Sequence, residues 1–417
     1  MRGGGEVNSH AICAQGMNAM TSPIMPVYNP APVTPVRGEG IWLTEADGTR
    51  WLDCINGVAT NALGHCHPAL VEALTRQAGK LWHTSNAIRV PGQTELAEKL
   101  VANSFADRVF FSNTGTEAVE CAIKTARRYH KVNGQPERFE VIGFTGSFHG
   151  RTYGAINASG NPAYLDGFGP PLPGFLHLSM DDHEAFAEAV ARPGMAAVIV
   201  EPVQGEGGAR AFSGEDLQRL RRLCTEHGVL LIHDEVQSGM GRTGKLFAHQ
   251  WFEGAEPDIM AIAKALGSGF PVGACLATEE AAKGLVVGTH GSTFGGNPLG
   301  MAVALAAFDV IASEETLANA RTVSDYLRTS LQAVAERNPD MIVELRGKGM
   351  LVGLKLKPNN RGFLMKGWEQ HILLSGCGDN CVRILPPLIL TEAEADEIVR
   401  RVEATCEAMR VQLAAVA

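Results

Sequence analysis

The sequence predicts an α/β protein with a wound, mainly parallel sheet in a large domain and a smaller α+β domain. First, the 417 residues exceed one ordinary domain and can bury a large core. Second, from about residue 95 to 280, short apolar runs alternate with amphipathic helical segments, which is typical of a parallel sheet. Third, two long helical patterns and a strand-rich end follow residue 300.

The chain before residue 95 supplies a few elements of its own. Residues 1–20 contain too short an apolar stretch for a signal peptide, and we expect a disordered arm there. Asp47–Gly48, between the runs Gly40–Leu43 and Arg50–Asp53, predicts a hairpin. Helical spacing follows in His67–Ala78. We assign residues 21–75 to a segment that joins the small domain.

The alternating region, residues 76–300, is expected to form the large, cofactor-binding domain. The predicted strands are its short apolar runs, Arg108–Phe111, Phe139–Ile142, Ala197–Val200 and Val229–Ile232. The predicted helices between them include Glu117–His130 and Gly214–Glu226. The small domain is expected to comprise residues 301–417. Its expected helices are Ala318–Glu336, Glu392–Met409 and Leu299–Ile311, the last of which spans the boundary with the large domain.

Composition narrows the class of ligand. A net charge of -9 repels phosphate backbones, so nucleic acid is not expected as a partner and small molecules are. The 9 cysteines include no CxxC pair, which favours reduced thiols in a cytosolic protein over disulfides or structural zinc. No apolar run approaches the ~20 residues of a membrane span, and we expect no membrane association.

Two residues at the ends of apolar runs point to chemistry. Asp234 follows one buried run, at the carboxyl edge of the sheet, where a carboxylate can keep a ring nitrogen protonated. Lys264 ends the run that starts at Asp258, and burial there favours its neutral, nucleophilic amine. A helix-capping aspartate and a surface lysine would explain the spacing about equally well.

Two further segments carry weaker signals. Ser112–Ala118 opens a helix, and Gly115 with Thr116 could cradle a phosphate at its N-terminus. An ordinary helix cap is the commoner explanation of such a segment taken alone. Phe148–Thr152 could stack on a ring and bind a carboxylate, or could be a plain loop.

Two apparent motifs favour no site. Gly239–Lys245 matches the start of a phosphate-binding loop, but Leu246 replaces the hydroxyl that binds magnesium, so a simple loop is predicted. His65–Cys66–His67 looks metal-binding, but Gly64 and Pro68 indicate a turn into a helix. We expect no metal site.

Together the motifs resemble the class III (subgroup II) aminotransferases of pyridoxal-phosphate (PLP) fold type I. The resemblance spans about Met25–Met409. It rests on Asn61–Pro68, Gly115–Ala118, Phe148–Arg151, Glu201–Gly208, Asp234–Gln237, Met240–Gly244, Lys264 and His290–Pro298.

The resemblance implies a PLP site. Lys264 would hold the cofactor as a Schiff base and move the proton, with Asp234 on the ring nitrogen as the second catalytic residue. Gln237 would reach the phenolic oxygen, and Phe148 and Val236 would sandwich the ring. The cofactor-binding set is completed by Glu235, Gly115, Thr116 and, from a partner subunit, Thr293. Because Thr293 acts across subunits, a homodimer with shared active sites is implied.

The resemblance also implies a substrate site. Arg151 and Arg383 would bind carboxylates, and Glu206 would mask Arg383 while the amino donor is bound and release it for 2-oxoglutarate. The resemblance also implies that Ser292 contacts the substrate. One site could then serve amino donor and 2-oxoglutarate in turn, in a ping-pong cycle.

Within the family the chain is most similar to acetylornithine aminotransferases, which implies δ-transamination of acetylornithine or succinylornithine for arginine biosynthesis. Departures are Ala263 where relatives usually have Ser, Ser268 where they have Gly, and Thr60 in place of an apolar residue. Transamination of 4-aminobutyrate, ornithine or lysine therefore remains open. A decarboxylase or racemase on the same fold is a more remote alternative.

Overall fold

A computed structural model describes residues 23–416 of the chain. The chain divides into a short unit, Met1–Thr34, and a large unit, Pro35–Ala417. The described residues of the short unit, 23–34, form no helix or strand. The disordered arm expected for residues 1–20 lies outside the described residues.

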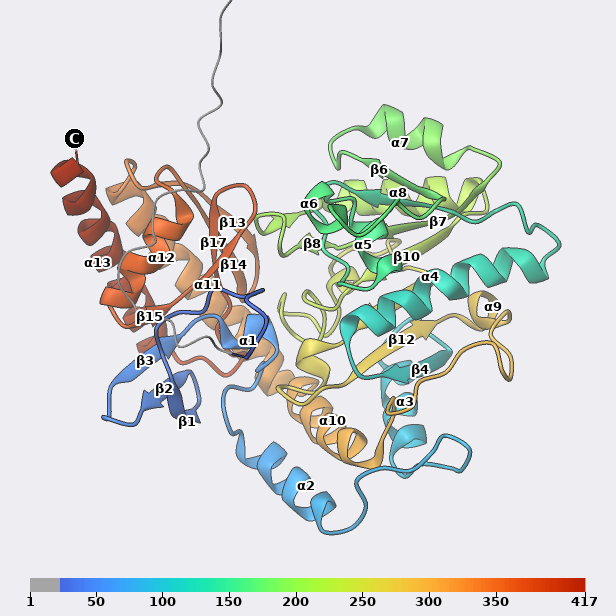
Figure 1. The fold of residues 1–417 in the computed structure, drawn as a ribbon, viewed down its shortest axis with the longest axis horizontal. Coiled ribbons are helices and arrows are strands. Elements are labelled where there is room, and N and C mark those ends of the chain that lie inside the picture. Colours follow the sequence, from blue (N-terminus) through green and yellow to red (C-terminus); the bar gives the residue numbers. More distant parts are fainter. Residues whose placement is uncertain (1–22, 417) are drawn as a thin grey trace, which may run out of the picture. The chain divides into compact units, whose positions relative to one another are not determined.

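The large unit contains a seven-stranded sheet, whose labelled strands are on the right in Figure 1. Its strands, in spatial order, are β4 (Arg108–Ser112), β12 (Gly273–Ala277), β11 (Ile259–Ile262), β10 (Leu230–Asp234), β7 (Met195–Val200), β5 (Glu140–Phe144) and β6 (Phe175–Leu178). All pairings are parallel except those that β12 makes with β11 and β4. The predicted wound, mainly parallel sheet is thus confirmed.

Helices cover both faces of this sheet because its strands are apolar on both sides. In β7 the side chains of Ala197 and Ile199 pack into one core cluster with α4 (Gly115–Val132). Val198 and Val200 point the other way, into a cluster with α7 (His183–Val190) and α8 (Gly214–Glu226). This alternation of period two explains why the buried strand is an unbroken hydrophobic run.

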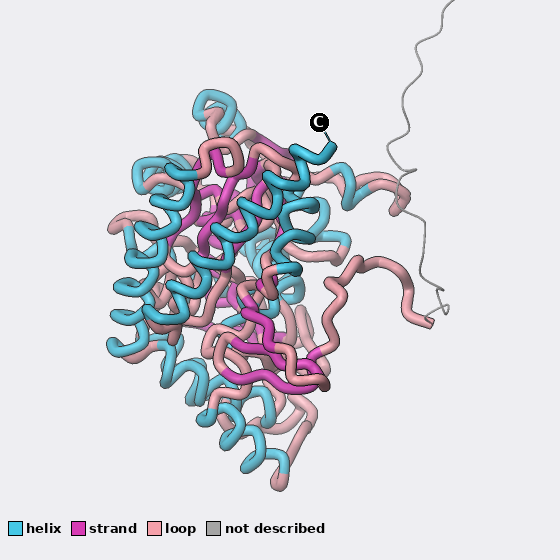
Figure 2. Tube along the Cα trace, turned by 90° about the vertical axis from the view of Figure 1, so that its left-hand side faces the viewer, coloured by secondary structure: helices cyan, strands magenta, loops and turns pink. Residues whose placement is uncertain are grey.

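The chain beyond residue 300 builds a second, smaller sheet and its helices (Figure 1), of which the last helix ends at the mark C in Figure 2. Its strands, in spatial order, are β13 (Ile342–Lys348), β14 (Leu351–Leu356), β17 (Cys381–Ile384) and β16 (Ser375–Cys377). Its helices are α11 (Glu314–Arg337), α12 (Asn360–Glu369) and α13 (Glu392–Val416), and α10 (Pro298–Ile311) leads into them. All three predicted long helices are present, displaced by a few residues at their ends.

The segment from residue 35 to 59 reaches the C-terminal part through strand pairing. The predicted hairpin is formed by β2 (Trp42–Glu45) and β3 (Arg50–Asp53), after β1 (Pro35–Glu39). β3 then pairs in parallel with β15 (Ile372–Leu373). The short helix α1 (Asn56–Ala59) follows directly.

The remaining helices and strands are short or connect the larger ones. They are α2 (Pro68–Ala78), α3 (Gln93–Ala102), α5 (Tyr153–Ser159), α6 (Pro162–Leu165), α9 (Glu279–Ala282), β8 (Val203–Gln204), β9 (Arg210–Ala211) and the 3₁₀ turns η1 (Ala248–Trp251) and η2 (Lys264–Leu266). Within residues 23–416 no helix combines the length and apolarity needed to cross a membrane.

Candidate active site

A cavity of about 420 Å³ opens where β10 and β11 end, next to the first turn of α4. The carboxyl edge of a parallel sheet is where α/β folds bind ligands. The cavity is lined by Thr60, Asn113, Thr114, Gly115, Thr116, Phe148, His149, Gly150, Arg151, Glu201, Glu206, Asp234, Val236, Gln237, Ala263, Lys264, Gly269, Phe270, Pro271 and Val272. It therefore brings together most of the residues singled out from the sequence.

Lys264 lies in the wall of this cavity, two residues after the end of β11. Its backbone has a φ of +43°, in a region that non-glycine residues rarely adopt and that is found most often at functional sites. Burial, and the positive charge of Arg383, lower the pKa of the Lys264 amine to about 8, although Glu206, Asp234 and Glu201 oppose the shift. The neutral, nucleophilic form of the amine is therefore more abundant near neutral pH than in an ordinary lysine.

Asp234 is the last residue of β10 and is held by a buried histidine. Its Oδ2 lies 2.7 Å from His149 Nδ1, and its Oδ1 accepts a hydrogen bond from the Val236 amide at 3.0 Å. Burial opposes protonation of His149, yet the hydrogen bond and charge of Asp234, together with Glu201, raise the pKa of His149 above its ordinary value. The same hydrogen bonds fix the position of the Asp234 side chain at the edge of the cavity.

The first turn of α4 also lines the cavity. Thr114 caps the helix by accepting a hydrogen bond from the Glu117 amide. A Cβ on Gly115 would lie 2.6 Å from Val236 Cγ1, so only glycine allows this close approach. Thr116 Oγ1 lies 3.0 Å from Thr152 Oγ1. Thr152 Oγ1 itself donates to Glu120 Oε1, so Thr116 and the free amides of the helix N-terminus are the groups that suit an anionic ligand.

Arg383 is a fully buried arginine of β17 and links three side chains. Its Nη2 lies 2.6 Å from Glu206 Oε1 and donates to Ser375 Oγ at 3.0 Å. Its Nη1 donates to Gln237 Oε1 at 3.1 Å. Its Nε has no hydrogen-bond partner among the described residues. The ion pair with Glu206 is the one that the sequence suggested.

Arg151 lines the cavity, with its guanidinium over two aromatic rings. Its guanidinium lies 4.0 Å from the centre of the Tyr164 ring and 5.3 Å from that of Phe148. Cation–π contacts of this kind hold the planar group without using its hydrogen-bond donors. Arg151 can therefore bind a carboxylate in the cavity.

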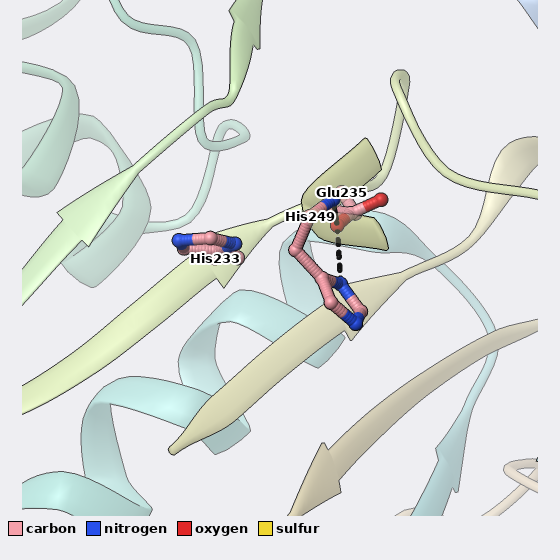
Figure 3. A group of neighbouring side chains, drawn as sticks. All are labelled: His233, Glu235 and His249. Atoms are coloured by element: carbon pink, nitrogen blue, oxygen red, sulfur yellow. Dashed lines mark hydrogen bonds and ion pairs between the residues drawn. The ribbon is translucent and has the colours of Figure 1, made fainter. Parts of the chain in front are cut away.

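Glu235 does not line the cavity, although the sequence placed it in the cofactor site. Its side chain is buried against η1, where its Oε1 accepts hydrogen bonds from the His249 amide and from His249 Nδ1 (Figure 3). Its Oε2 accepts one from the Ala248 amide. Asp234 and Glu235 are consecutive, so their side chains point in different directions. Asp234 faces the cavity, whereas Glu235 holds η1 in place.

His233, Glu235 and His249 are the one group of the described residues whose ligand atoms lie close enough together to suggest a metal (Figure 3). Both carboxylate oxygens and His249 Nδ1 are already engaged in the hydrogen bonds just described. Burial, followed by the charges of His249 and Arg221, lowers the pKa of His233 well below its usual value. The three side chains are thus held by hydrogen bonds and packing.

Ser292 and Thr293 line a separate cavity of about 390 Å³, not the one around Lys264. Ser292 Oγ accepts hydrogen bonds from Asn113 Nδ2 at 3.2 Å and from the Gly295 amide at 3.0 Å. A single chain therefore does not bring these two residues to the site.

Two residues of the site were quoted in motifs but given no role from the sequence. His149 holds Asp234, as described above. Glu201 accepts hydrogen bonds from the amides of Phe148 and Gly205, at 2.8 and 3.1 Å, and so ties together the two loops that carry Phe148 and Glu206. Glu201 directly follows the apolar run of β7, which is the same pattern that singled out Asp234.

The three departures from the family pattern lie in the cavity lining or directly beside it. Thr60 and Ala263 line it, and Ser268 Oγ accepts a hydrogen bond from the Leu63 amide at 3.0 Å. Ser268 thereby connects the turn after Lys264 to the loop that carries Thr60. All three differences leave Lys264 and Asp234 in place.

An α/β fold with a buried lysine in a cavity at the carboxyl edge of its sheet is typical of an enzyme. Comparison with known proteins identifies the family. The family model "Aminotransferase class-III" matches residues 24–406, so the chain belongs to the class III aminotransferases.

Named relatives come from several bacteria. Acetylornithine aminotransferase 2 of Caulobacter vibrioides is 62% identical over 392 residues, 94% of this chain and 97% of that protein. Acetylornithine aminotransferase of Brucella melitensis is 50% identical over 93% of this chain and 96% of its own length.

Solved structures of the same family superpose over nearly the whole chain. Ornithine aminotransferase of Toxoplasma gondii has a TM-score of 0.89 at 34% identity and covers 94% of both chains. N-acetylornithine aminotransferase of Stenotrophomonas maltophilia has a TM-score of 0.80 at 38% identity, covering 93% of this chain and 98% of its own.

Proposed function

We propose that this chain transfers the terminal amino group of N-acetylornithine to 2-oxoglutarate, with PLP bound at Lys264. The observation that carries the proposal is one cavity lined by a lysine of lowered pKa, a histidine-bound aspartate and Arg151, with Arg383 buried behind its lining residues Glu206 and Gln237. The names of the relatives at 62% and 50% identity support this amino donor. Such an activity serves arginine biosynthesis, which fits a cytoplasmic enzyme.

The donors in the cavity fit PLP. Lys264 offers an amine for the aldehyde, Asp234 a carboxylate for the ring nitrogen, and the first turn of α4 its amides and the Thr116 hydroxyl for the phosphate. A solved relative, ornithine aminotransferase of Toxoplasma gondii, is described with PLP at its active site. When bound, PLP supplies an electron sink for amino-group transfer.

The chain's own residues then have distinct tasks. Lys264 would carry the proton to and from the substrate carbon, since its lowered pKa suits both directions of transfer. His149 would orient Asp234 through the hydrogen bond to its Oδ2. Because Arg383 engages Gln237 Oε1, the Nε2 of Gln237 is left as a donor for the phenolic oxygen of the ring. Phe148 and Val236 would cover the two ring faces.

The two arginines would bind carboxylates of both substrates. Arg151 is open to the cavity, whereas Arg383 is paired with Glu206. While that pair is intact, Arg383 is masked and the site suits a long amino donor. For 2-oxoglutarate, Glu206 would move aside and expose Arg383 to the second carboxylate.

We further propose a homodimer in which Thr293 of one subunit completes the phosphate site of the other. Two features of the described residues support it. Thr293 lines a cavity next to the start of α4 and away from Lys264. Large apolar side chains are exposed close to Thr293, among them Val287 and Phe294 in the same segment and Trp82, and exposed apolar surface of this kind is typical of an interface.

The proposed substrate is tested by comparing kcat/KM for acetylornithine, succinylornithine, ornithine and 4-aminobutyrate, with glutamate formation as the readout. Acetylornithine should be preferred by at least about tenfold, since specificity is the ratio of these constants. A preference for ornithine or 4-aminobutyrate would replace the proposed donor but keep the class of reaction. Release of CO2 without glutamate would contradict transamination itself.

The switch is tested with Glu206→Ala, which leaves Arg383 unmasked throughout the cycle. The half-reaction with the long amino donor should slow by roughly 10- to 100-fold, while glutamate and 2-oxoglutarate bind at least as well as before. Stopped-flow absorbance measures the two halves separately. Asp181→Ala, which breaks a surface ion pair with Arg210, is the matched control. Equal slowing of both halves would mean that Glu206 is only structural.

The lowered pKa of Lys264 predicts how fast the apoprotein captures PLP. Only the neutral amine attacks an aldehyde, so the second-order rate should rise about tenfold per pH unit below pH 8 and level off above it. Absorbance at a series of pH values from about 7 to 10 measures this. A rate that keeps rising to the top of that range would indicate an ordinary lysine. Lys264→Ala should show no capture phase.

A further inference from the structure

A small cavity of about 260 Å³ lies outside the active site, between α11, the turn that joins β13 to β14, and the loop after β10. It is lined by Thr243, Trp251, Arg321, Ser324, Asp325, Arg328, Gly347, Lys348 and Gly349. Three of these side chains are cations. Thr243 belongs to the Gly239–Lys245 segment, which matches the start of a phosphate-binding loop and which forms turns here, as predicted.

The cations are only partly neutralised by protein groups. Arg321 pairs with Glu314 and donates to the Gly244 carbonyl. Arg328 makes one hydrogen bond within residues 23–416, from Nη1 to the Arg346 carbonyl at 2.9 Å. Lys348 makes no hydrogen bond or ion pair among the same residues; its Nζ lies 4.1 Å from the centre of the Trp251 ring. Donors of Arg328 and Lys348 therefore remain for a ligand.

Electrostatics in the cavity favour an anion. Burial, followed by repulsion from Arg328, lowers the pKa of Lys348, and Asp325 only partly compensates. Asp325 is the one acidic side chain among the described residues that lines the cavity, and it is exposed to solvent. A bound anion would relieve the repulsion between the two cations.

The backbone holds these groups in fixed positions. Gly347 and Gly349, on either side of Lys348, have φ of +87° and +58°. A Cβ on Gly349 would lie 2.6 Å from the Thr243 carbonyl carbon, so the turn rests directly on the loop. Trp251 Nε1 donates to the Thr243 carbonyl at 3.2 Å. The cavity is thus preorganised, which lowers the entropic cost of binding.

We propose that this cavity is a binding site for a small oxyanion, held by Arg328 and Lys348 against Trp251. Arginine forms paired hydrogen bonds with both phosphate and carboxylate oxygens, and the cavity has room for either kind of ion. The site is separate from the proposed catalytic site, since the two cavities share no lining residue. The proposal does not depend on which amine the enzyme uses.

The test titrates the PLP-loaded protein with inorganic phosphate and, separately, with malonate, while sodium chloride keeps the ionic strength constant. The signal is the emission of Trp251, obtained as the difference between the parent and a Trp251→Phe variant. This difference excludes changes that arise from anions at Arg151 or Arg383. At least one of the two anions should give a saturable change.

Lys348→Met and Arg328→Leu should each weaken that binding by at least about tenfold, the loss of one charge-assisted hydrogen bond. Lys131→Met, which removes an exposed lysine at the end of α4, should leave it unchanged. If Arg328→Leu does not fold, Lys348→Met alone decides. A signal that follows only ionic strength, or one that both variants leave unchanged, overturns the proposal.

Discussion

Lys264→Ala should lower turnover by at least about 10⁴-fold, because it removes both the group that binds the cofactor and the group that moves the proton. Alanine removes a cation that is costly to bury, so the fold should be retained and its thermal stability should not fall. The measurements are steady-state glutamate formation and covalent retention of the cofactor after borohydride reduction.

The control for this variant is Lys131→Ala, at an exposed lysine far along α4, which should keep full activity. Borohydride should fix the cofactor to the parent protein at Lys264 and should not fix it to the variant. An active Lys264→Ala protein with the cofactor fixed at another lysine would show that the catalytic lysine is misassigned.

Asp234→Asn should lower the rate of the glutamate half-reaction by at least about 100-fold while PLP stays bound. Asparagine has nearly the same shape and can still accept the hydrogen bond from the Val236 amide. It cannot supply the negative charge that keeps the ring nitrogen protonated, and it leaves His149 without an anionic partner. Single-turnover absorbance measures the rate, and ultrafiltration measures bound PLP.

Asp258→Asn is the matched control for this substitution. Asp258 lies just before β11, away from the cavity, where it pairs with Arg221 at 2.8 Å. The same chemical change there should affect stability and leave the single-turnover rate near that of the parent. A near-parent rate in Asp234→Asn would reject the assigned role of Asp234.

The sequence predicted those parts of the fold whose pattern is local. The runs that became β7 and β10 are continuously apolar because helices cover both faces, and the long amphipathic helices carry clear periodicity. Strands β6, β11 and β12 were not among the predicted strands, although the apolar run that contains β11 was noted because it ends at Lys264. β12 contains Gly273, Ala274 and Ala277, so its sequence lacks the β-branched residues typical of strands. It is a strand because β4 and β11 flank it.

In the candidate site, too, the sequence predicted the residues that a local pattern marks and missed those that long-range contacts bring together. Asp234 and Lys264 could be singled out because each ends an apolar run at the carboxyl edge of the sheet. The hydrogen bond from His149 to Asp234 could not, because it joins positions distant in sequence. Glu235 was misplaced because a motif does not tell which way each of its side chains points. Ser292 and Thr293 also depend on long-range packing, which local pattern does not report.

The parallel pairing of β3 with β15 has a consequence for synthesis of the chain on the ribosome. The two strands are about 320 residues apart, so β3 emerges early and cannot find its partner until nearly the whole chain has been made. Until then its edge is unpaired and prone to wrong partners, whereas the seven-stranded sheet can assemble from residues 108–277 alone. During synthesis, the pairing of β3 with β15 should therefore be among the last parts of the sheet structure to gain protection from hydrogen exchange.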